Sequence, residues 1–181
     1  MATLISGSTG VNKITDGTIT NADIASGAAI AGTKLVMPTG SLLQVVSASN
    51  QRGFSFTSTD WITTQTTLAI TPSSTNSKIL VKYNSGLGYC DTTNASFQTF
   101  FTIFRGSTNI ANNTTYGCAG GYQGGVSFGD FGWSTAFEKL DSPSSTSAVT
   151  YTIKCRQHSS SHTQVMDYRG ESTITLMEIA G

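Results

Sequence analysis

Two histidines form the closest candidate metal pair in this chain. His158 and His162 stand four residues apart in the run HSSSH, a spacing that places two imidazoles toward one metal ion when the segment is a helix. The serine-rich flanks indicate a loop instead. Neither the glutamate of an HExxH motif nor an evident third ligand accompanies the pair. We therefore expect a solvated loop here, with no metal and no other cofactor.

Cys155 and His158 are close enough in sequence to suggest a thiol nucleophile with its base. In 148–156, however, every second residue from Val149 to Cys155 is apolar, which is the pattern of a half-buried strand. A thiol on the apolar face of such a strand is usually a small, inert hydrophobe. The chain also lacks a GxSxG motif, a phosphate-binding P-loop and a close pair of carboxylates. We expect no catalytic residue and no enzymatic activity.

A glycine-rich and aromatic segment, 116–133, is the most informative stretch for binding. It holds seven glycines and five aromatic residues, and a single charged residue. So much glycine argues against regular strand structure and allows close approach of a ligand or a neighbouring chain. Flat rings beside amides and one carboxylate suit a sugar. The candidate ligand surface is Tyr116, Tyr122, Asp130 and Trp133. The alternative, an inter-strand loop whose aromatics fill the core or a subunit interface, stays open.

The composition of the whole chain limits its class. Lys and Arg number 10, Asp and Glu number 10, and charged residues are 11% of the 181 positions, whereas 24 Ser, 29 Thr and 19 Gly are present. Ten scattered cations do not make the basic patch of a nucleic-acid binder. No apolar stretch approaches the length of a membrane span, and Glu and Lys are too few for a helical bundle. An all-β protein remains, with a surface of hydroxyls and amides that suits a subunit of a large assembly.

The first 37 residues form a separate segment, called the arm (1–37). Its isolated apolar residues recur at spacings of 5, 5, 6 and 5, which fits neither a helix nor a single half-buried strand. Three copies wound about one axis would bury them, so we expect an extended arm that trimerises and attaches. A disordered tail is the alternative. The candidate arm contacts are Ile14, Ile19, Ile24, Ile30 and Leu35.

Residues 38–181, called the knob, begin at the Pro-Thr-Gly turn and show strand signals at short intervals. No helix-period segment separates these signals, which excludes parallel βαβ units. We expect an antiparallel β-sandwich of jelly-roll type. The predicted strands are 41–48, 63–71, 77–85, 96–105, 132–139, 148–156 and 172–179.

The predicted strand 96–105 is apolar on both faces. Phe97, Phe101 and Ile103 alternate onto one face, whereas Phe100 and Phe104 alternate onto the other. Burying both faces requires a second layer of protein outside the sandwich. A neighbouring subunit supplies that layer most simply, so Phe100 and Phe104 are the candidate trimer interface. A long loop of the same chain is the alternative.

Several phrases of the chain resemble a known family. ITDGTITNADIASGAAIAGTKL resembles N-terminal segments of fibre-like structural proteins of tailed bacteriophages, especially marine and cyanobacterial phages. The phrases ITPSSTNSKILVKYN, FTIFRGSTNIA, LDSPSSTSAVTYTIKCR and STITLMEIAG are similar to the C-terminal jelly-roll knob of such virion proteins. The resemblance covers nearly the whole chain, and it supplies no catalytic residue.

The resemblance implies a homotrimer located in the virion. The arm would contact other virion proteins, and the knob would attach to host-surface glycan, with no nucleic acid bound and no membrane insertion. The fibre could stand on the tail or on the head. The alternative within the same family is a capsid or tail decoration protein, which stabilises the particle without binding a receptor.

Overall fold

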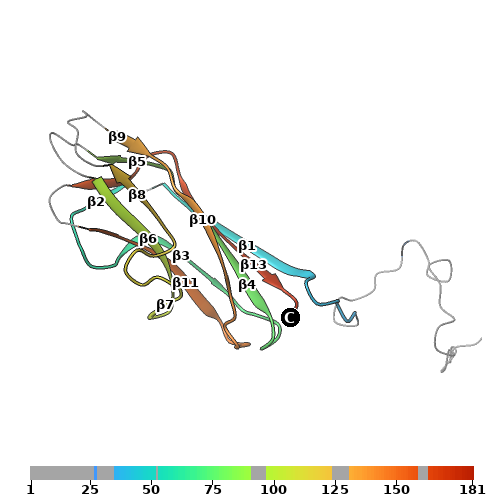
Figure 1. The fold of residues 1–181 in the computed structure, drawn as a ribbon. Helices are drawn as coiled ribbons and strands as arrows, with labels where there is room; N and C mark the ends of the chain where they lie inside the picture. Colours follow the sequence, from blue (N-terminus) through green and yellow to red (C-terminus); the bar gives the residue numbers. More distant parts are fainter. Residues whose placement is uncertain (1–26, 28–34, 52, 91–96, 124–130, 159–162) are drawn as a thin grey trace, which may run out of the picture. The chain divides into compact units, whose positions relative to one another are not determined.

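The described part of the chain is built from β-strands. The computed structural model describes residues 27, 35–51, 53–90, 97–123, 131–158 and 163–181 (Figure 1). Within these ranges every regular element is a strand, and no helix there is long and apolar enough to cross a membrane. The chain divides into two units, Met1–Val36 and Met37–Gly181, and all of the described strands lie in the second.

Three antiparallel sheets make up the knob, and within each sheet neighbouring strands are hydrogen-bonded in the following order. Sheet I contains β1 (Leu42–Asn50), β13 (Ser172–Ile179), β4 (Lys78–Asn84) and β10 (Ala136–Asp141). Sheet II contains β3 (Ile62–Ile70), β11 (Val149–Gln157), β6 (Phe97–Arg105) and β7 (Thr108–Asn109), and β8 (Ala119–Gln123) also pairs with β6. Sheet III contains β2 (Phe54–Phe56), β12 (Gln164–Arg169), β5 (Leu87–Cys90) and β9 (Phe131–Trp133).

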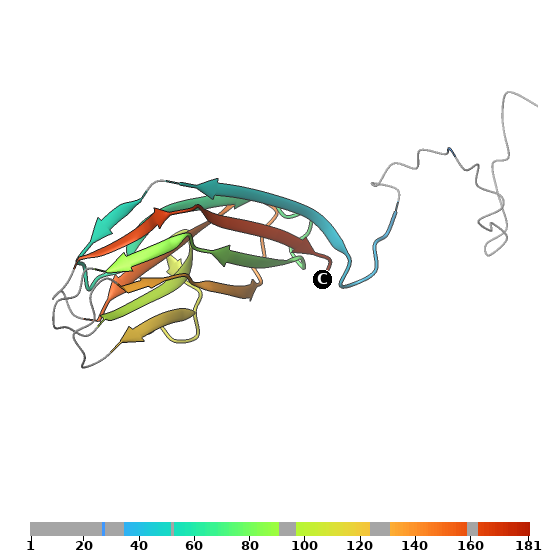
Figure 2. The same ribbon diagram turned by 90° about the horizontal axis from the view of Figure 1, so that it is seen from above.

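Sheets I and II stack face to face as two layers (Figure 2). Each strand of sheet III is joined to a strand of sheet I by a short link, and the neighbour order is the same in both sheets. Sheet III therefore continues the strands of sheet I. The links are residues 51–53, 85–86, 134–135 and 170–171.

The first strand of the knob is held along its length by the last one. The pairing of β1 with β13 runs from Leu42 opposite Ile179 to Asn50 opposite Ser172. Before Leu42 the two segments stay paired, because the Gly40 N–H donates to the Ala180 carbonyl at 2.8 Å and the Ala180 N–H donates to the Ser41 carbonyl at 2.8 Å. The segment that leads out of the arm is thus fixed to the edge of sheet I.

The core lies between sheets I and II and follows the alternation of the strands. Side chains of β4 and β13 in sheet I meet side chains of β6 and β11 in sheet II. The Tyr83 ring lies 6.4 Å from the Phe101 ring and 5.3 Å from the Phe137 ring, between centroids. The fully buried apolar members of the core cluster are Ile79, Val81, Phe101, Ile103, Tyr151, Ile153, Cys155, Met166, Ile174 and Leu176.

The all-β, antiparallel, sandwich-like fold predicted from the sequence is confirmed. Six predicted strands correspond to β1, β3, β4, β6, β11 and β13. The predicted strand 132–139 is two strands, β9 and β10, because Ser134 and Thr135 interrupt it. The short strands β2, β5, β7, β8 and β12 were not predicted.

The prediction that glycine excludes regular strands from 116–133 is wrong. Strands β8 and β9 lie within that segment. Gly120 sits opposite Phe100 in the pairing of β8 with β6, and a Cβ at Gly120 would lie 2.6 Å from the Phe100 ring. The missing side chain therefore lets β8 pair directly beside a large aromatic residue. Here glycine permits the strand instead of breaking it.

A carboxylate lies fully buried in sheet I. Glu178 on β13 accepts hydrogen bonds on Oε1 from the Ser73 N–H at 2.7 Å and from the hydroxyls of Ser73 and Ser77 at 2.6 Å each. Its Oε2 accepts from the Gln44 amide at 2.5 Å. Burial raises the pKa of the Glu178 carboxyl, but these hydrogen bonds together lower the pKa by more. The bonds join β13 to β1 and to the loop between β3 and β4.

This carboxylate predicts a stability that depends on acid. Because the pKa of Glu178 is lowered by folding, its contribution is present above the ordinary value of 4.5 and is lost as the pH falls through the lower folded value. Glu178→Gln should cost about 1–3 kcal/mol at neutral pH and should make the loss of stability below pH 4.5 shallower. Urea unfolding at a series of pH values measures both effects.

The control is Glu171→Gln, which removes the same charge from an exposed residue. It should change the unfolding free energy by less than about 0.5 kcal/mol. An unchanged acid slope in Glu178→Gln would show that the buried carboxylate is not the titrating group.

Candidate functional site

Aromatic side chains gather on the outer face of sheet II. On β6, Phe101 and Ile103 point into the core with no exposed surface, so alternation directs Phe100 and Phe104 outward. Both outward rings are half-buried. Strand β6 therefore carries apolar side chains on both faces, as predicted, and its outer face needs a cover.

The chain itself covers part of Phe100. The Tyr116 ring meets the Phe100 ring edge-on at 5.1 Å between centroids, and the His158 ring approaches it edge-on at 6.4 Å. Both distances lie in the range of favourable aromatic contacts. A loop of the same chain, the alternative to a neighbouring subunit, thus contributes to this face.

A tight turn positions Tyr116. The Asn113 side-chain oxygen accepts hydrogen bonds from the N–H groups of Thr115 and Tyr116 at 3.0 Å each. The Gly117 N–H then donates to the Asn113 carbonyl at 2.8 Å, and the Cys118 N–H donates to the Phe101 carbonyl at 2.7 Å. Side-chain oxygens of asparagine commonly close turns in this way. The turn returns the chain directly onto β6.

Trp61 lies beside this turn, and a cationic side chain packs over its ring. Its Nε1–H donates to the Thr114 carbonyl at 3.2 Å, and the Arg156 guanidinium lies over its ring, 5.1 Å from the centroid. Arg156 also donates to the Thr59 carbonyl, at a long 3.4 Å. A second cation, Lys154, places its Nζ 4.0 Å from the centroid of Phe104. We call Trp61, Phe100, Phe104, Tyr116 and Tyr122 the aromatic face.

The predicted ligand residues are divided by the structure. Tyr116 and Tyr122 are exposed, with 51% and 68% of their surface accessible, and Tyr122 lies opposite Gln98 on the same outer face. Trp133 instead packs against the core, with its ring directly over Gly88. Asp130 lies outside the described residues.

Sequence reasoning missed Trp61 and Arg156. The alternation of 148–156 predicts a half-buried strand, but it does not show which residues lie beside its outward positions. Register supplies the missing information, because Arg156 pairs opposite Phe100 and Lys154 pairs opposite Thr102. Only that pairing sets the basic side chains beside the outward rings of β6.

The candidate trimer residues have partners within the knob. Phe100 contacts Tyr116 and His158, and Phe104 contacts Lys154, yet both rings keep exposed surface. Their role between subunits stays a prediction. Of the candidate arm contacts, Leu35 is exposed, and Ile14, Ile19, Ile24 and Ile30 lie outside the described residues.

A second apolar surface crosses the outer face of sheet I. Val45 pairs with Met177, Met177 with Leu80, and Leu80 with Leu140, so one apolar row spans all four strands. Val45 and Leu140 are 49% and 46% exposed. A second pair, Leu42 and Ile179, lies where β1 begins. We call these residues together the apolar patch, defined as Leu42, Val45, Leu80, Leu140, Met177 and Ile179.

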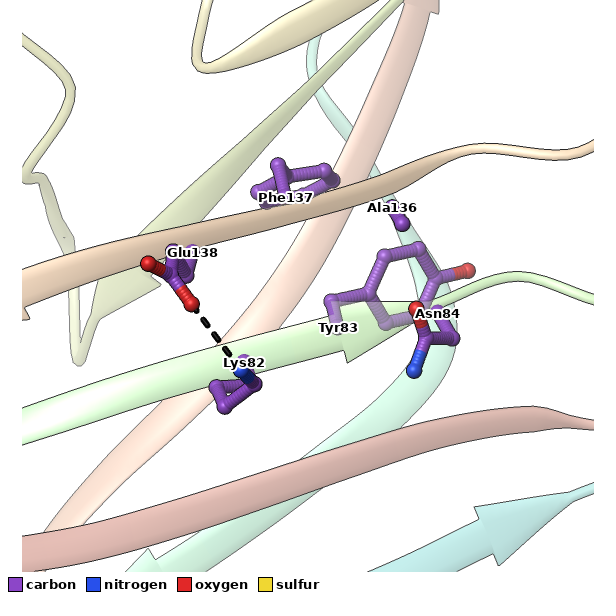
Figure 3. Close-up of a pocket in the computed structure, with 6 residues that line it drawn as sticks. All are labelled: Lys82, Tyr83, Asn84, Ala136, Phe137 and Glu138. Atoms are coloured by element: carbon purple, nitrogen blue, oxygen red, sulfur yellow. Dashed lines mark hydrogen bonds and ion pairs between the residues drawn. The ribbon is translucent and has the colours of Figure 1, made fainter.

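Two hollows adjoin strand β10, and neither presents an exposed aromatic ring. The first, of about 260 Å³, is lined by β4 and β10, and the Lys82 and Glu138 side chains meet there at 3.0 Å (Figure 3). The second, of about 240 Å³, lies between β10 and the Ala111–Cys118 loop. Since its cation and carboxylate are already paired, the first hollow is a weaker candidate than the aromatic face.

The histidine and cysteine candidates are separated from each other. Cys155 is fully buried in the core, as its place on the apolar face predicts, whereas His158 is exposed. His162 lies outside the described residues. Among the residues that are described, no group of three possible metal-binding side chains comes together.

Comparison with known proteins adds no relative to this picture: no protein-family model and no curated protein matches the chain.

The turn before β8 gives a testable prediction. Gly117 has a φ of +73°, and a Cβ there would overlap the Phe101 carbonyl and touch the Trp61 ring. Gly106 has a comparable φ of +56° with open space around it. Gly117→Ala should therefore destabilise the knob by about 1–3 kcal/mol more than Gly106→Ala, because overlap adds to the shared backbone strain. Thermal and urea unfolding measure the difference. Equal losses in the two variants would contradict the close contact of this turn with β6.

Proposed function

We propose that the chain is a structural protein of a tailed-bacteriophage virion. In this proposal the arm (1–37) anchors a homotrimeric fibre or appendage, and the knob (38–181) attaches to host-surface glycan without enzymatic activity. The resemblance of the arm and knob phrases supports the virion location. The observation that supports attachment is the aromatic face, because exposed rings flanked by polar groups suit the C–H faces and hydroxyls of sugars.

The pairing of strands supports a jelly roll as the finer fold. When sheet III is taken as the continuation of sheet I, the first strand pairs with the last, β3 pairs with β11, β4 pairs with β10, and β6 pairs with β8. Nested pairing of this kind results from rolling up one long antiparallel hairpin. A double-sheet jelly roll built of Greek keys has this connectivity, and it is a common architecture of viral proteins.

The apolar patch supports contact between copies of the chain. Exposed apolar surface that is continuous across several strands commonly marks an interaction site. This patch lies where β1 begins, a few residues after the arm, so three arms joined together would bring three patches close. Beyond it the same face turns polar, with Ser47, Thr175, Lys82 and Glu138 in register. We assign the trimer contact of the knob to the apolar patch, and Phe100 and Phe104 remain the competing candidates.

One observation favours the decoration protein as a second candidate function. Phe100 and Phe104 are partly covered by side chains of the same knob, and the two hollows present no exposed ring. A protein that only stabilises the particle requires no receptor pocket. Both candidates use the same trimer and differ in whether the aromatic face contacts the host.

The assignment of the trimer contact to the apolar patch predicts which substitution separates the subunits. Val45→Asp places a charge in the middle of the apolar patch and should give monomers, because an unpaired charge is costly in a dry contact. Ser49→Asp, on the same face of the same strand, is the matched control and should stay trimeric. Sedimentation by analytical ultracentrifugation measures both. Trimeric Val45→Asp together with monomeric Phe104→Asp would transfer the contact to the aromatic face.

The attachment role predicts a loss of cell binding. Replacing both Tyr116 and Tyr122 by Ala removes two exposed rings and should weaken binding of the full-length protein to host cells by about tenfold or more, since avidity in a trimer multiplies a modest loss per site. Replacing both by Phe keeps the rings and should retain most of the binding. The readout is adsorption of labelled protein, with thermal unfolding to confirm the fold. Normal adsorption of a folded double-Ala variant would favour the decoration protein.

A further inference from the structure

Strand β11 directs a row of basic groups onto the aromatic face. Lys154, Arg156 and His158 alternate outward, since Ile153, Cys155 and Gln157 between them are buried. Each basic side chain lies against a ring: Lys154 against Phe104, Arg156 against Trp61, and His158 against Phe100. Lys154 and Arg156 are two of the ten Lys and Arg residues of the chain, and both lie on this one surface.

The cations of this row have no carboxylate partner among the described residues. The ion pairs found there are Lys82 with Glu138, at 3.0 Å, and Arg105 with Asp141, at 2.8 Å. Lys139 donates to the Asn112 amide oxygen. Arg156, in contrast, makes one long bond to a carbonyl, and its buried Nε has no partner in the described part of the chain. Its positive charge therefore has no carboxylate partner in the described part of the chain and lies over the half-buried Trp61 ring.

We propose that the aromatic face binds an acidic saccharide, whose carboxylate or phosphate is held by Arg156 with Lys154 nearby. This inference rests on the glycan attachment proposed above and specifies its chemical class. The rings of Tyr116 and Trp61 contact the apolar face of the sugar, and the guanidinium supplies paired N–H donors to the acid group. Lying over Trp61 fixes the arginine side chain in advance, which reduces the entropy lost on binding.

The alternative anionic partner is a single-stranded nucleic acid, which also uses rings and cations. The amount of charge argues against it. Nucleic-acid affinity comes largely from neutralising many phosphates, whereas this row offers two permanent cations and the chain has no net positive charge. A sugar with one acid group matches the two permanent cations, Lys154 and Arg156, better than a chain of phosphates does.

The test uses the full-length protein and matched neutral and acidic probes in calorimetric titration. Trigalacturonic acid is compared with its methyl ester, and glucose 6-phosphate with glucose, so that carboxylate and phosphate are distinguished. We expect an acidic probe to bind at least about fivefold more tightly than its neutral match, and to weaken as salt is added. Arg156→Gln should remove that preference, a loss of about tenfold in affinity for the acidic probe.

Lys82→Gln is the control variant, because it removes the same charge from the outer face of the other layer and should leave binding unchanged. Equal affinity for acid and ester, or an unchanged Arg156→Gln, would overturn the acidic specificity and leave the glycan function standing. Absence of binding to both acidic probes at about 10 mM would also overturn it. Tighter binding of an oligothymidylate than of trigalacturonic acid would assign the face to nucleic acid. Adsorption to host cells is measured separately with the Tyr116 and Tyr122 variants. Failure of the attachment role can therefore be distinguished from failure of the acidic specificity.

Discussion

The architecture of the knob depends on one strand having to bury large side chains on both faces. Phe101 and Ile103 of β6 complete the core, and Phe100 and Phe104 on the opposite face require a second cover. The hydrophobic effect penalises exposed rings on either side. The turn before β8 places Tyr116 against Phe100, and β8 itself pairs beside β6 in the same sheet. Part of the aromatic face follows from that constraint, since Tyr116, which covers Phe100, is itself aromatic.

The two layers of the sandwich consequently present surfaces of different chemistry. The outer face of sheet II combines rings with cations that have no carboxylate partner in the described part of the chain. The outer face of sheet I carries the apolar patch at the end where β1 begins, and paired or hydroxyl side chains beyond it. Such a separation suits a protein that associates with its own copies through one face and contacts another molecule through the other. Because charged residues are only 11% of the chain, both surfaces differ clearly from the remaining surface of hydroxyl and amide groups.

The sequence was sufficient for those parts of the knob in which local pattern decides structure. Alternation in 148–156 correctly placed Cys155 in the core, and the alternation around Phe100 correctly indicated an outward ring. Contacts set by register could not be predicted. Gln65 adopts a φ of 64°, and the pairing of β3 with β11 shifts between Thr152 and Lys154. Such irregularities have no sequence signature, yet they determine which side chains of neighbouring strands come into contact. The glycine-based prediction of an irregular segment was wrong at Gly120 because the role of this glycine depends on the Phe100 ring, which belongs to another strand.

The pairing of β1 with β13 has a mechanical consequence. A pull on Met37 directed along β1 would run perpendicular to the inter-strand hydrogen bonds from Gly40 to Asn50. All of these bonds are then loaded in shear at the same time, instead of being peeled apart one after another. The buried Glu178 ties the neighbouring loop to the same two strands, which stiffens the loaded end. Under such a pull, β1 would leave sheet I only when these hydrogen bonds break together.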